Sequence, residues 1–252
     1  MANWNDPQPT RRSGQQGFGA APGLNPSVPG TQAGFDAGLR KYMLSIYNYM
    51  ASGVLLSGIV AVAMANTALG ISIITSPAMF LIVFAPLAIV FAMSFGANRF
   101  SQGTLQALFW GFAVLMGMSL STIFLVYTGE SIAATFFATA GAFAGLSLFG
   151  YTTKKDLSGM GSFLIMGVIG LIIASVINLF LQSSALYWAI SFLGVLIFAG
   201  LTAYDTQRLK AQYFHLAGTE FLGKAVILGA LSLYLDFINM FQFLLAFMGQ
   251  RD

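Results

Sequence analysis

The sequence predicts an all-α integral membrane protein with seven transmembrane helices. Of its 252 residues, 57% are hydrophobic and only 8% are charged, against about 25% charged residues in soluble domains. Seven apolar runs follow one another, each of about 20 residues and so able to cross a hydrocarbon core of about 30 Å as a helix. The absence of cysteine excludes disulfides, thiolate metal sites and cysteine nucleophiles.

The spans are separated by polar or helix-stopping residues. These breaks are Ser76-Pro77, Asn98-Arg99, Gly129-Glu130, Lys154-Lys155-Asp156 and Gln182-Ser183-Ser184. We accordingly place the first six spans at about 44–65, 77–97, 104–127, 131–151, 162–181 and 186–208. Within the fourth, Gly141-x-x-x-Gly145 is typical of close helix packing, which we interpret as an intramolecular seam rather than a dimer contact.

Lys224 determines where the seventh span begins. An ammonium group reaches water only from near a helix end, so the hydrocarbon should start beyond it, which gives a span at 228–249. A polar connection, 209–227, remains, and we assign no role to its single histidine, His215. Residues 1–36 are rich in Gly, Pro, Gln, Asn and Ser and predict a disordered cytoplasmic tail before the seven-helix domain, 37–252.

The basic residues predict the orientation of the chain. Ten of the eleven Lys and Arg residues fall on the N-terminal side of the membrane, and only Arg251 falls opposite. By the positive-inside rule, the N-terminus is cytoplasmic and the C-terminus lies outside. Because these residues are scattered singly or in adjacent pairs between apolar runs, rather than gathered on one face, we expect lipid rather than nucleic acid as the partner.

Asp205 and Asp236 are the two acidic residues that fall inside spans. A carboxylate in hydrocarbon costs several kcal/mol unless it is paired, neutralised or facing water, so both are functional candidates. At 1.5 Å per residue, they lie about 5 Å and about 12 Å inside the cytoplasmic ends of their helices. If the helices are adjacent, the two carboxyl groups share a proton and form a pH sensor. Arg99 lies at the same cytoplasmic depth and is a candidate ion-pair partner for either aspartate. Protonation of the aspartates would weaken that pairing and release Arg99.

The segments around the two aspartates resemble the last two spans of the Bax inhibitor-1 family, and the bacterial branch in particular. They read YDTQ at 204–207 and LYLDFIN at 233–239, and the resemblance extends over residues 40–250. It implies a seven-helix bundle with the C-terminal helix central and surrounded by the other six, in the bacterial inner membrane. It also implies a pH-sensitive calcium leak in which Asp205 and Asp236 form a di-aspartyl sensor and gate, with Arg99 as its latch.

The chemistry of the residues is compatible with calcium as the permeant ion, without a resident cofactor. Calcium takes carboxylate, carbonyl, amide and water oxygens in loose geometry. Two carboxylates, Asp205 and Asp236, make a weak and transient site, which suits permeation because the ion must leave as readily as it enters. Auxiliary oxygens are available nearby, from Thr202, Tyr204, Thr206 and Asn239.

Two other classes of function compete with a leak channel. A regulator that binds a membrane protease or a cell-death protein would use the aspartates only to set its conformation. An intramembrane aspartyl protease would also place Tyr-Asp in one span and a second aspartate in the next. In those enzymes Gly-x-Gly precedes the second aspartate and Pro-Ala-Leu follows, whereas Tyr234-Leu235 precedes Asp236 here, so we do not expect an enzyme.

Overall fold

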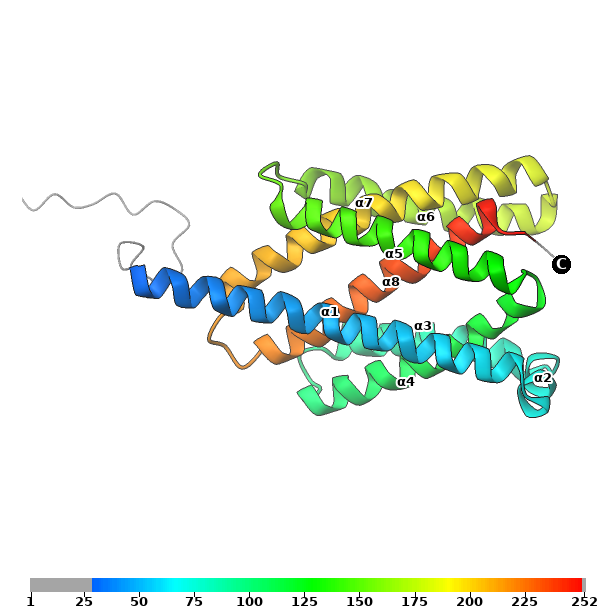
Figure 1. Ribbon diagram of the computed structural model, residues 1–252, viewed down its shortest axis with the longest axis horizontal. Coiled ribbons are helices and arrows are strands. Elements are labelled where there is room, and N and C mark those ends of the chain that lie inside the picture. The colour runs from blue at the N-terminus through cyan, green and yellow to red at the C-terminus, as the bar shows by residue number, and fades with distance from the viewer. Residues whose placement is uncertain (1–28, 251–252) are drawn as a thin grey trace, which may run out of the picture.

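The chain folds into a bundle of long helices, shown in Figure 1 as a computed structural model that describes residues 29–250. The elements are α1 (Pro29–Ala65), α2 (Ala68–Ile74), α3 (Ala78–Gly96), α4 (Gln102–Leu120), the 3-10 helix η1 (Ser121–Leu125), α5 (Gly129–Thr152), α6 (Ser158–Leu181), α7 (Ser184–Leu216) and α8 (Leu222–Met248). Between residues 29 and 250 there is no β-strand. Seven helical stretches are long and apolar enough to span a membrane, which confirms the predicted fold class.

Hydroxyl side chains start several of these helices. Thr67, Ser101, Thr128 and Ser183 each accept a hydrogen bond from the backbone N–H three residues further on. Such caps satisfy amide groups that have no partner in the first turn of a helix. They explain why α4, α5 and α7 begin close to the predicted breaks between spans.

Helix α8 is the core of the bundle. Half of its most apolar 18-residue window is buried (50%), compared with 11% in α6. It packs against α1, α4, α5 and α7, while α3 packs mainly on α4 and α6 mainly on α7. The prediction of a central C-terminal helix is therefore confirmed, although its main contacts are with four of the other six spanning helices, and α3 and α6 lie outermost.

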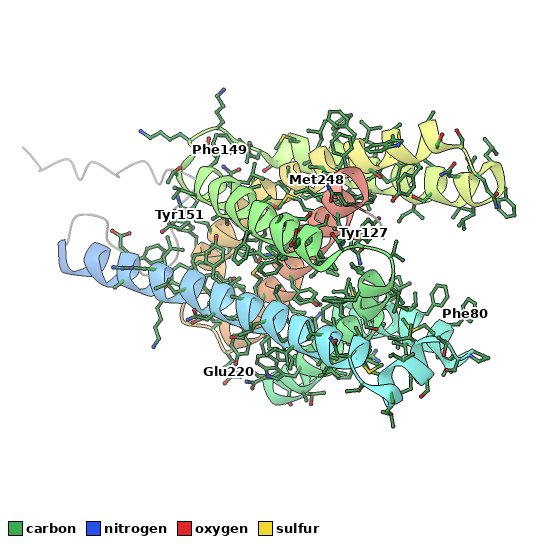
Figure 2. All side chains as sticks on the ribbon, turned by 45° about the vertical axis from the view of Figure 1, so that its right-hand side comes forward. Phe80, Tyr127, Phe149, Tyr151, Glu220 and Met248 are labelled. Carbon is green, nitrogen blue, oxygen red and sulfur yellow. The ribbon has the colours of Figure 1, made fainter. Side chains whose placement is uncertain are left out.

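The outer surface is apolar. Phe80 and Phe149 point away from the bundle and are 73% and 50% exposed, as Figure 2 shows. Large aliphatic side chains of α6, such as Ile172 and Leu179, are exposed in the same way. A surface of this composition is expected where lipid is the solvent, since lipid tails are as apolar as the side chains they meet.

The connection predicted at 209–227 is wrong, because α7 continues to Leu216 and α8 begins at Leu222. The extension of α7 is held by α1. The Tyr213 ring lies 5.1 Å from that of Phe35 and 5.4 Å from that of Tyr42, measured between ring centroids. The prediction overlooked that Leu209 and Tyr213, four residues apart, form a buried helical face.

Two further expectations need correction. The predicted tail, 1–36, overlaps α1, which already starts at Pro29, and the rest of that tail lies outside the described residues. The Gly141-x-x-x-Gly145 seam is not a packing contact, since a Cβ atom added at either glycine would meet nothing within 4 Å. On the same helix, a Cβ added at Gly150 would collide with the backbone of Ala203, so this glycine is the close approach of α5 to α7.

The described basic residues gather at one end of the bundle. We call this the basic end: it comprises the start of α1, the α3–α4, α5–α6 and α7–α8 connections and the flanking helix turns. It contains Arg40, Lys41, Arg99, Lys154, Lys155, Arg208, Lys210 and Lys224. Eight of the ten basic residues that the sequence assigns to one side therefore lie at one end, whereas Arg11, Arg12 and Arg251 lie outside the described residues. The compartment that this end faces stays a prediction.

Candidate functional site

Asp205 and Asp236 lie on the two helices that pack most extensively against each other, α7 and α8. Each residue is only 5% exposed. The Ser232 hydroxyl, one turn before Asp236 on α8, donates a short hydrogen bond to Oδ2 of Asp205 on α7. The two acidic residues predicted from the sequence therefore lie at adjacent levels of one helix interface, about one turn apart.

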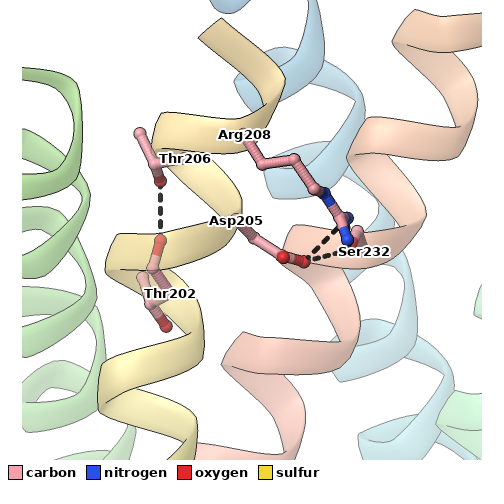
Figure 3. Close-up of polar contacts among 5 residues, drawn as sticks. All are labelled: Thr202, Asp205, Thr206, Arg208 and Ser232. Atoms are coloured by element: carbon pink, nitrogen blue, oxygen red, sulfur yellow. Dashed lines mark hydrogen bonds and ion pairs between the residues drawn. The ribbon is translucent and has the colours of Figure 1, made fainter. Parts of the chain in front are cut away.

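Arg208 is the cation at this site, as Figure 3 shows. It follows Asp205 by one turn on α7, and its Nη2 lies 3.2 Å from Oδ2 of Asp205. The same nitrogen donates to Oγ of Ser232 at 3.1 Å. Arg208, Asp205 and Ser232 thus form a closed triangle of contacts that links α7 to α8, and we call it the clamp.

Asp236 lies beside the clamp without joining it. Its Oδ2 atom is buried and has no hydrogen-bond partner among the described residues. Its electrostatic neighbours are Asp205 and Arg208. A buried carboxylate oxygen without a partner is costly, and such atoms usually mark a bound water, a bound ion or a site that changes partners.

Arg99 pairs with neither aspartate among the described residues, so its predicted role as the latch stays a prediction. It is exposed in the α3–α4 connection and forms no ion pair within residues 29–250. That connection touches the start of α8, where Lys224 Nζ donates to the Ala97 carbonyl at 3.4 Å. Asp236 follows Lys224 by twelve residues on α8, so it lies about 18 Å along the helix axis from Lys224 at 1.5 Å per residue. Arg208, one turn from Asp205, occupies the place predicted for Arg99.

Of the four predicted auxiliary oxygens, those of Thr202 and Thr206 do not take part in the site. The Thr202 hydroxyl donates to the Phe198 carbonyl at 2.8 Å, and that of Thr206 donates to the Thr202 carbonyl at the same distance. Thr206 also bonds Ser147 of α5 at 2.8 Å. Figure 3 shows both threonines on the side of α7 turned away from Asp205.

The other two predicted oxygens also have different roles here. The Tyr204 ring lies beneath the Arg208 guanidinium, with 5.7 Å from Cζ to the ring centroid. Asn239 donates from Nδ2 to the carbonyl of Leu235 on its own helix at 2.8 Å. The oxygens gathered at the site are therefore those of Asp205, Asp236 and Ser232.

The site does not have the composition of a high-affinity metal centre. Among residues 29–250, no group of three or more His, Asp and Glu side chains lies close enough to hold one ion. Calcium usually takes six to eight oxygen ligands, so two carboxylates and a hydroxyl leave most positions to water or backbone carbonyls.

Sequence reasoning missed Arg208 and Ser232. Arg208 was counted only as an orientation signal, although Asp205-x-x-Arg208 has the spacing of an ion pair on one helix face. Ser232 precedes Asp236 by four residues, which places the two on one face of α8.

A second buried contact was also not predicted from the sequence. The hydroxyl groups of Ser57 on α1 and Tyr234 on α8 are 2.6 Å apart, and this hydrogen bond links the central helix to α1.

Comparison with known proteins gives a consistent result. The family model described as "Inhibitor of apoptosis-promoting Bax1" matches residues 39–252. An uncharacterised protein of Caulobacter vibrioides is 50% identical over 236 residues, which cover 88% of this chain and 94% of the relative. The inner membrane protein YbhL of Escherichia coli K12 is 47% identical over 219 residues, with 85% and 94% covered. An uncharacterised membrane protein of Streptococcus pyogenes is 37% identical, with 91% and 100% covered.

Proposed function

Since the chain belongs to the Bax inhibitor-1 family of membrane proteins, we propose that it is a pH-sensitive calcium leak channel gated by Asp205 and Asp236. The observation that carries this proposal is the pair of buried carboxylates on adjacent helices, one of them held by a clamp across the interface. Ionisable groups inside a membrane domain are costly and mark ion or proton pathways.

The clamp supplies the pH response. The contact between Arg208 and Asp205 is an ion pair only while Asp205 is ionised. A proton on Asp205 removes its charge, so the attraction to Arg208 falls and the link through Ser232 to α8 weakens. We assign the described conformation to the closed state, and expect acidification to favour separation of α7 from α8 and so to open the leak.

The carboxylates also provide the chemistry for passing calcium. Calcium is a hard cation that prefers oxygen ligands, and the unpartnered Oδ2 of Asp236 is such a ligand. A site with few protein ligands binds an ion weakly, which allows rapid release. Asp236 therefore acts as a transient calcium ligand once the clamp has released Asp205.

The setting that we propose follows that of YbhL, which is named as an inner membrane protein. The basic end of the bundle faces the cytoplasm by the positive-inside rule, so the N-terminus is cytoplasmic and the C-terminus lies outside. Lipid and calcium are the partners on this reading. Binding to a membrane protease or another membrane protein remains the alternative function, because the clamp would set conformation equally well without transport.

The test is calcium uptake into liposomes that contain the purified protein, measured from pH 8 to pH 5. We expect uptake by the natural chain to rise as the pH falls. Asp205→Asn should leak at every pH because it cannot form the ion pair, and Asp236→Asn should reduce acid-induced uptake because a calcium ligand is lost. Equal uptake and an identical pH response in all three chains would refute the dyad gate.

Two other outcomes would identify a different function. No calcium uptake at any pH would favour the regulator. Cleavage of a membrane-embedded peptide that either substitution abolishes would favour the protease.

A further inference from the structure

The end of the bundle opposite the basic end contains a groove between α6 and α8. Both helices pack on α7 and make few contacts with each other, and Figure 1 shows the α6–α7 connection and the end of α8 at the same end of the bundle. Two pockets, of about 470 Å³ and 360 Å³, lie here, and Asn178, Tyr187 and Ala246 line both of them. The two pockets are therefore continuous, and we call them together the α6–α8 groove.

The lining of the α6–α8 groove is polar but uncharged. Among the described residues that form it, there are amide, hydroxyl, indole and apolar side chains, but no Asp, Glu, Lys, Arg or His. The amides are those of Asn178, Gln182 and Gln242. Each amide offers two N–H donors and a carbonyl acceptor, so this lining can bind an anionic and a cationic group of the same ligand. A ligand with a net charge would find no opposite charge here, which makes its burial costly.

Several of these polar groups have no hydrogen-bond partner within residues 29–250. The half-buried Gln242 side chain forms no hydrogen bond there, and neither do Nδ2 of Asn178 and the hydroxyl of Ser175. Oδ1 of Asn178 accepts a hydrogen bond from the N–H of Ser183 at 3.0 Å. This contact holds the Asn178 side chain at the end of α6 and leaves its Nδ2 available to donate. Polar groups without partners are costly in a membrane, so the groove is built for a polar ligand.

The depth of these groups points to a lipid headgroup as that ligand. Ser175 lies six residues before the end of α6, and Gln242 lies six residues before the end of α8, which is about 9 Å in each case. With 24 residues, α6 is about 36 Å long and exceeds a hydrocarbon core of about 30 Å. The groove therefore lies where lipid headgroups meet their acyl chains. Trp188, which lines it, is 49% exposed and packs edge-on against Phe247, with 5.3 Å between ring centroids, and such aromatic residues are typical of this boundary.

We propose that the α6–α8 groove binds the headgroup of a zwitterionic phospholipid of the phosphatidylethanolamine class, from the leaflet opposite the basic end. Nδ2 of Asn178 and the Ser175 hydroxyl donate to the phosphate, and Oε1 of Gln242 accepts from the primary ammonium. A quaternary ammonium has no N–H for an amide oxygen, and a headgroup with net negative charge has no cation in the lining. The acyl chains continue along the exposed apolar face of α6, which includes Ile172 and Leu179.

This lipid site is independent of the proposed calcium leak. The groove lies at the start of α7 and the end of α8, whereas the clamp lies toward the basic end of both helices, and no clamp residue lines the groove. A lipid bound in the groove bridges the outermost helix α6 to the central helix α8. Because it binds the folded protein, it should also raise the melting temperature.

Native mass spectrometry of the purified full-length protein in detergent tests the site. The protein is incubated with equal amounts of phosphatidylethanolamine, phosphatidylcholine and phosphatidylglycerol that carry the same acyl chains. We expect the phosphatidylethanolamine adduct to dominate, and Gln242→Leu to weaken its binding about tenfold through loss of a hydrogen bond to a charged group. The matched control is Gln212→Leu, since Gln212 is also a half-buried glutamine but lies at the basic end. Equal lipid binding by Gln242→Leu and Gln212→Leu, or no preference for phosphatidylethanolamine, would overturn the proposal.

A second variant fills the groove without removing a polar group. Ala246 lines both pockets, so a phenylalanine ring at this position in Ala246→Phe should exclude the headgroup and abolish the phosphatidylethanolamine adduct. The control is Ala138→Phe, because Ala138 is an exposed alanine of α5 outside the groove. Melting temperatures provide a second readout: phosphatidylethanolamine should stabilise the natural chain and Ala138→Phe, but not Ala246→Phe. Equal stabilisation of all three chains would contradict the assignment.

Two other occupants of the groove would give different results. Binding of the water-soluble headgroup glycerophosphoethanolamine as tight as that of the intact lipid would identify a site for a solute. A change of oligomeric state in Gln242→Leu, measured by light scattering, with unchanged lipid adducts would assign the groove to contact with a second copy of the chain. Either result would overturn the lipid site.

Discussion

Removal of the Ser232 hydroxyl should shift the equilibrium between the closed and open states toward the open state by a calculable amount. Ser232 is the member of the clamp that belongs to α8: it donates to Asp205 and accepts from Arg208 at 3.1 Å, so Ser232→Ala deletes two interhelical hydrogen bonds. Hydrogen bonds between membrane helices contribute about 0.6 kcal/mol each on average. Loss of both therefore shifts the closed-to-open equilibrium by about 1.2 kcal/mol, which corresponds to a roughly eightfold larger open fraction.

The assay is the initial rate of calcium uptake into liposomes at pH 8, where the clamp is intact. Ser191→Ala is the matched control, because Ser191 is a buried serine of α7 whose hydroxyl donates at 2.8 Å to the Tyr187 carbonyl one turn earlier. We expect Ser232→Ala to raise the rate about eightfold and Ser191→Ala to leave it unchanged. A rate for Ser232→Ala equal to that of the control would refute the claim that the clamp holds the gate.

Three further predictions address the packing and the choice of arginine. Arg99→Gln should leave calcium uptake and its pH response unchanged, and a leak at pH 8 as large as that of Asp205→Asn would show that Arg99 holds the gate closed. Gly150→Val should lower the melting temperature of the purified protein, with a cost of about 1–3 kcal/mol from overpacking against Ala203, whereas Gly141→Val, facing open space, should melt like the natural chain. Tyr234→Phe removes the hydrogen bond to Ser57 and should cost about 0.6 kcal/mol, seen as a small fall in melting temperature with no change in the pH response; a changed response would show that this contact belongs to the gate.

The number of spans and the two aspartates were predictable because both follow from the cost of burial in lipid. Apolar runs of about 20 residues leave few alternatives to spanning helices, and carboxylates inside them stand out by their cost alone. The contact of Asp205 with α8 also agrees with the depths counted from the span boundaries.

The partners of the aspartates were harder to predict because they depend on how helices pack and turn. Arg99 and Arg208 are both basic residues near the same membrane face, and depth alone does not distinguish them. Only the packing of the α3–α4 connection against Lys224 shows that Arg99 lies far along α8 from Asp236. Likewise, the spacing of Gly141 and Gly145 does not reveal whether a helix faces them, and in this fold none does.

The most direct test of the account is calcium uptake by Asp205→Asn at pH 8, measured beside the natural chain in the same liposomes. The ion pair between Asp205 and Arg208 holds the gate shut on this account, so Asp205→Asn should leak at pH 8 and should not respond to acidification, while the natural chain stays closed until the pH falls. An Asp205→Asn protein that is as tight as the natural chain at pH 8 and opens at the same acidic pH would contradict it.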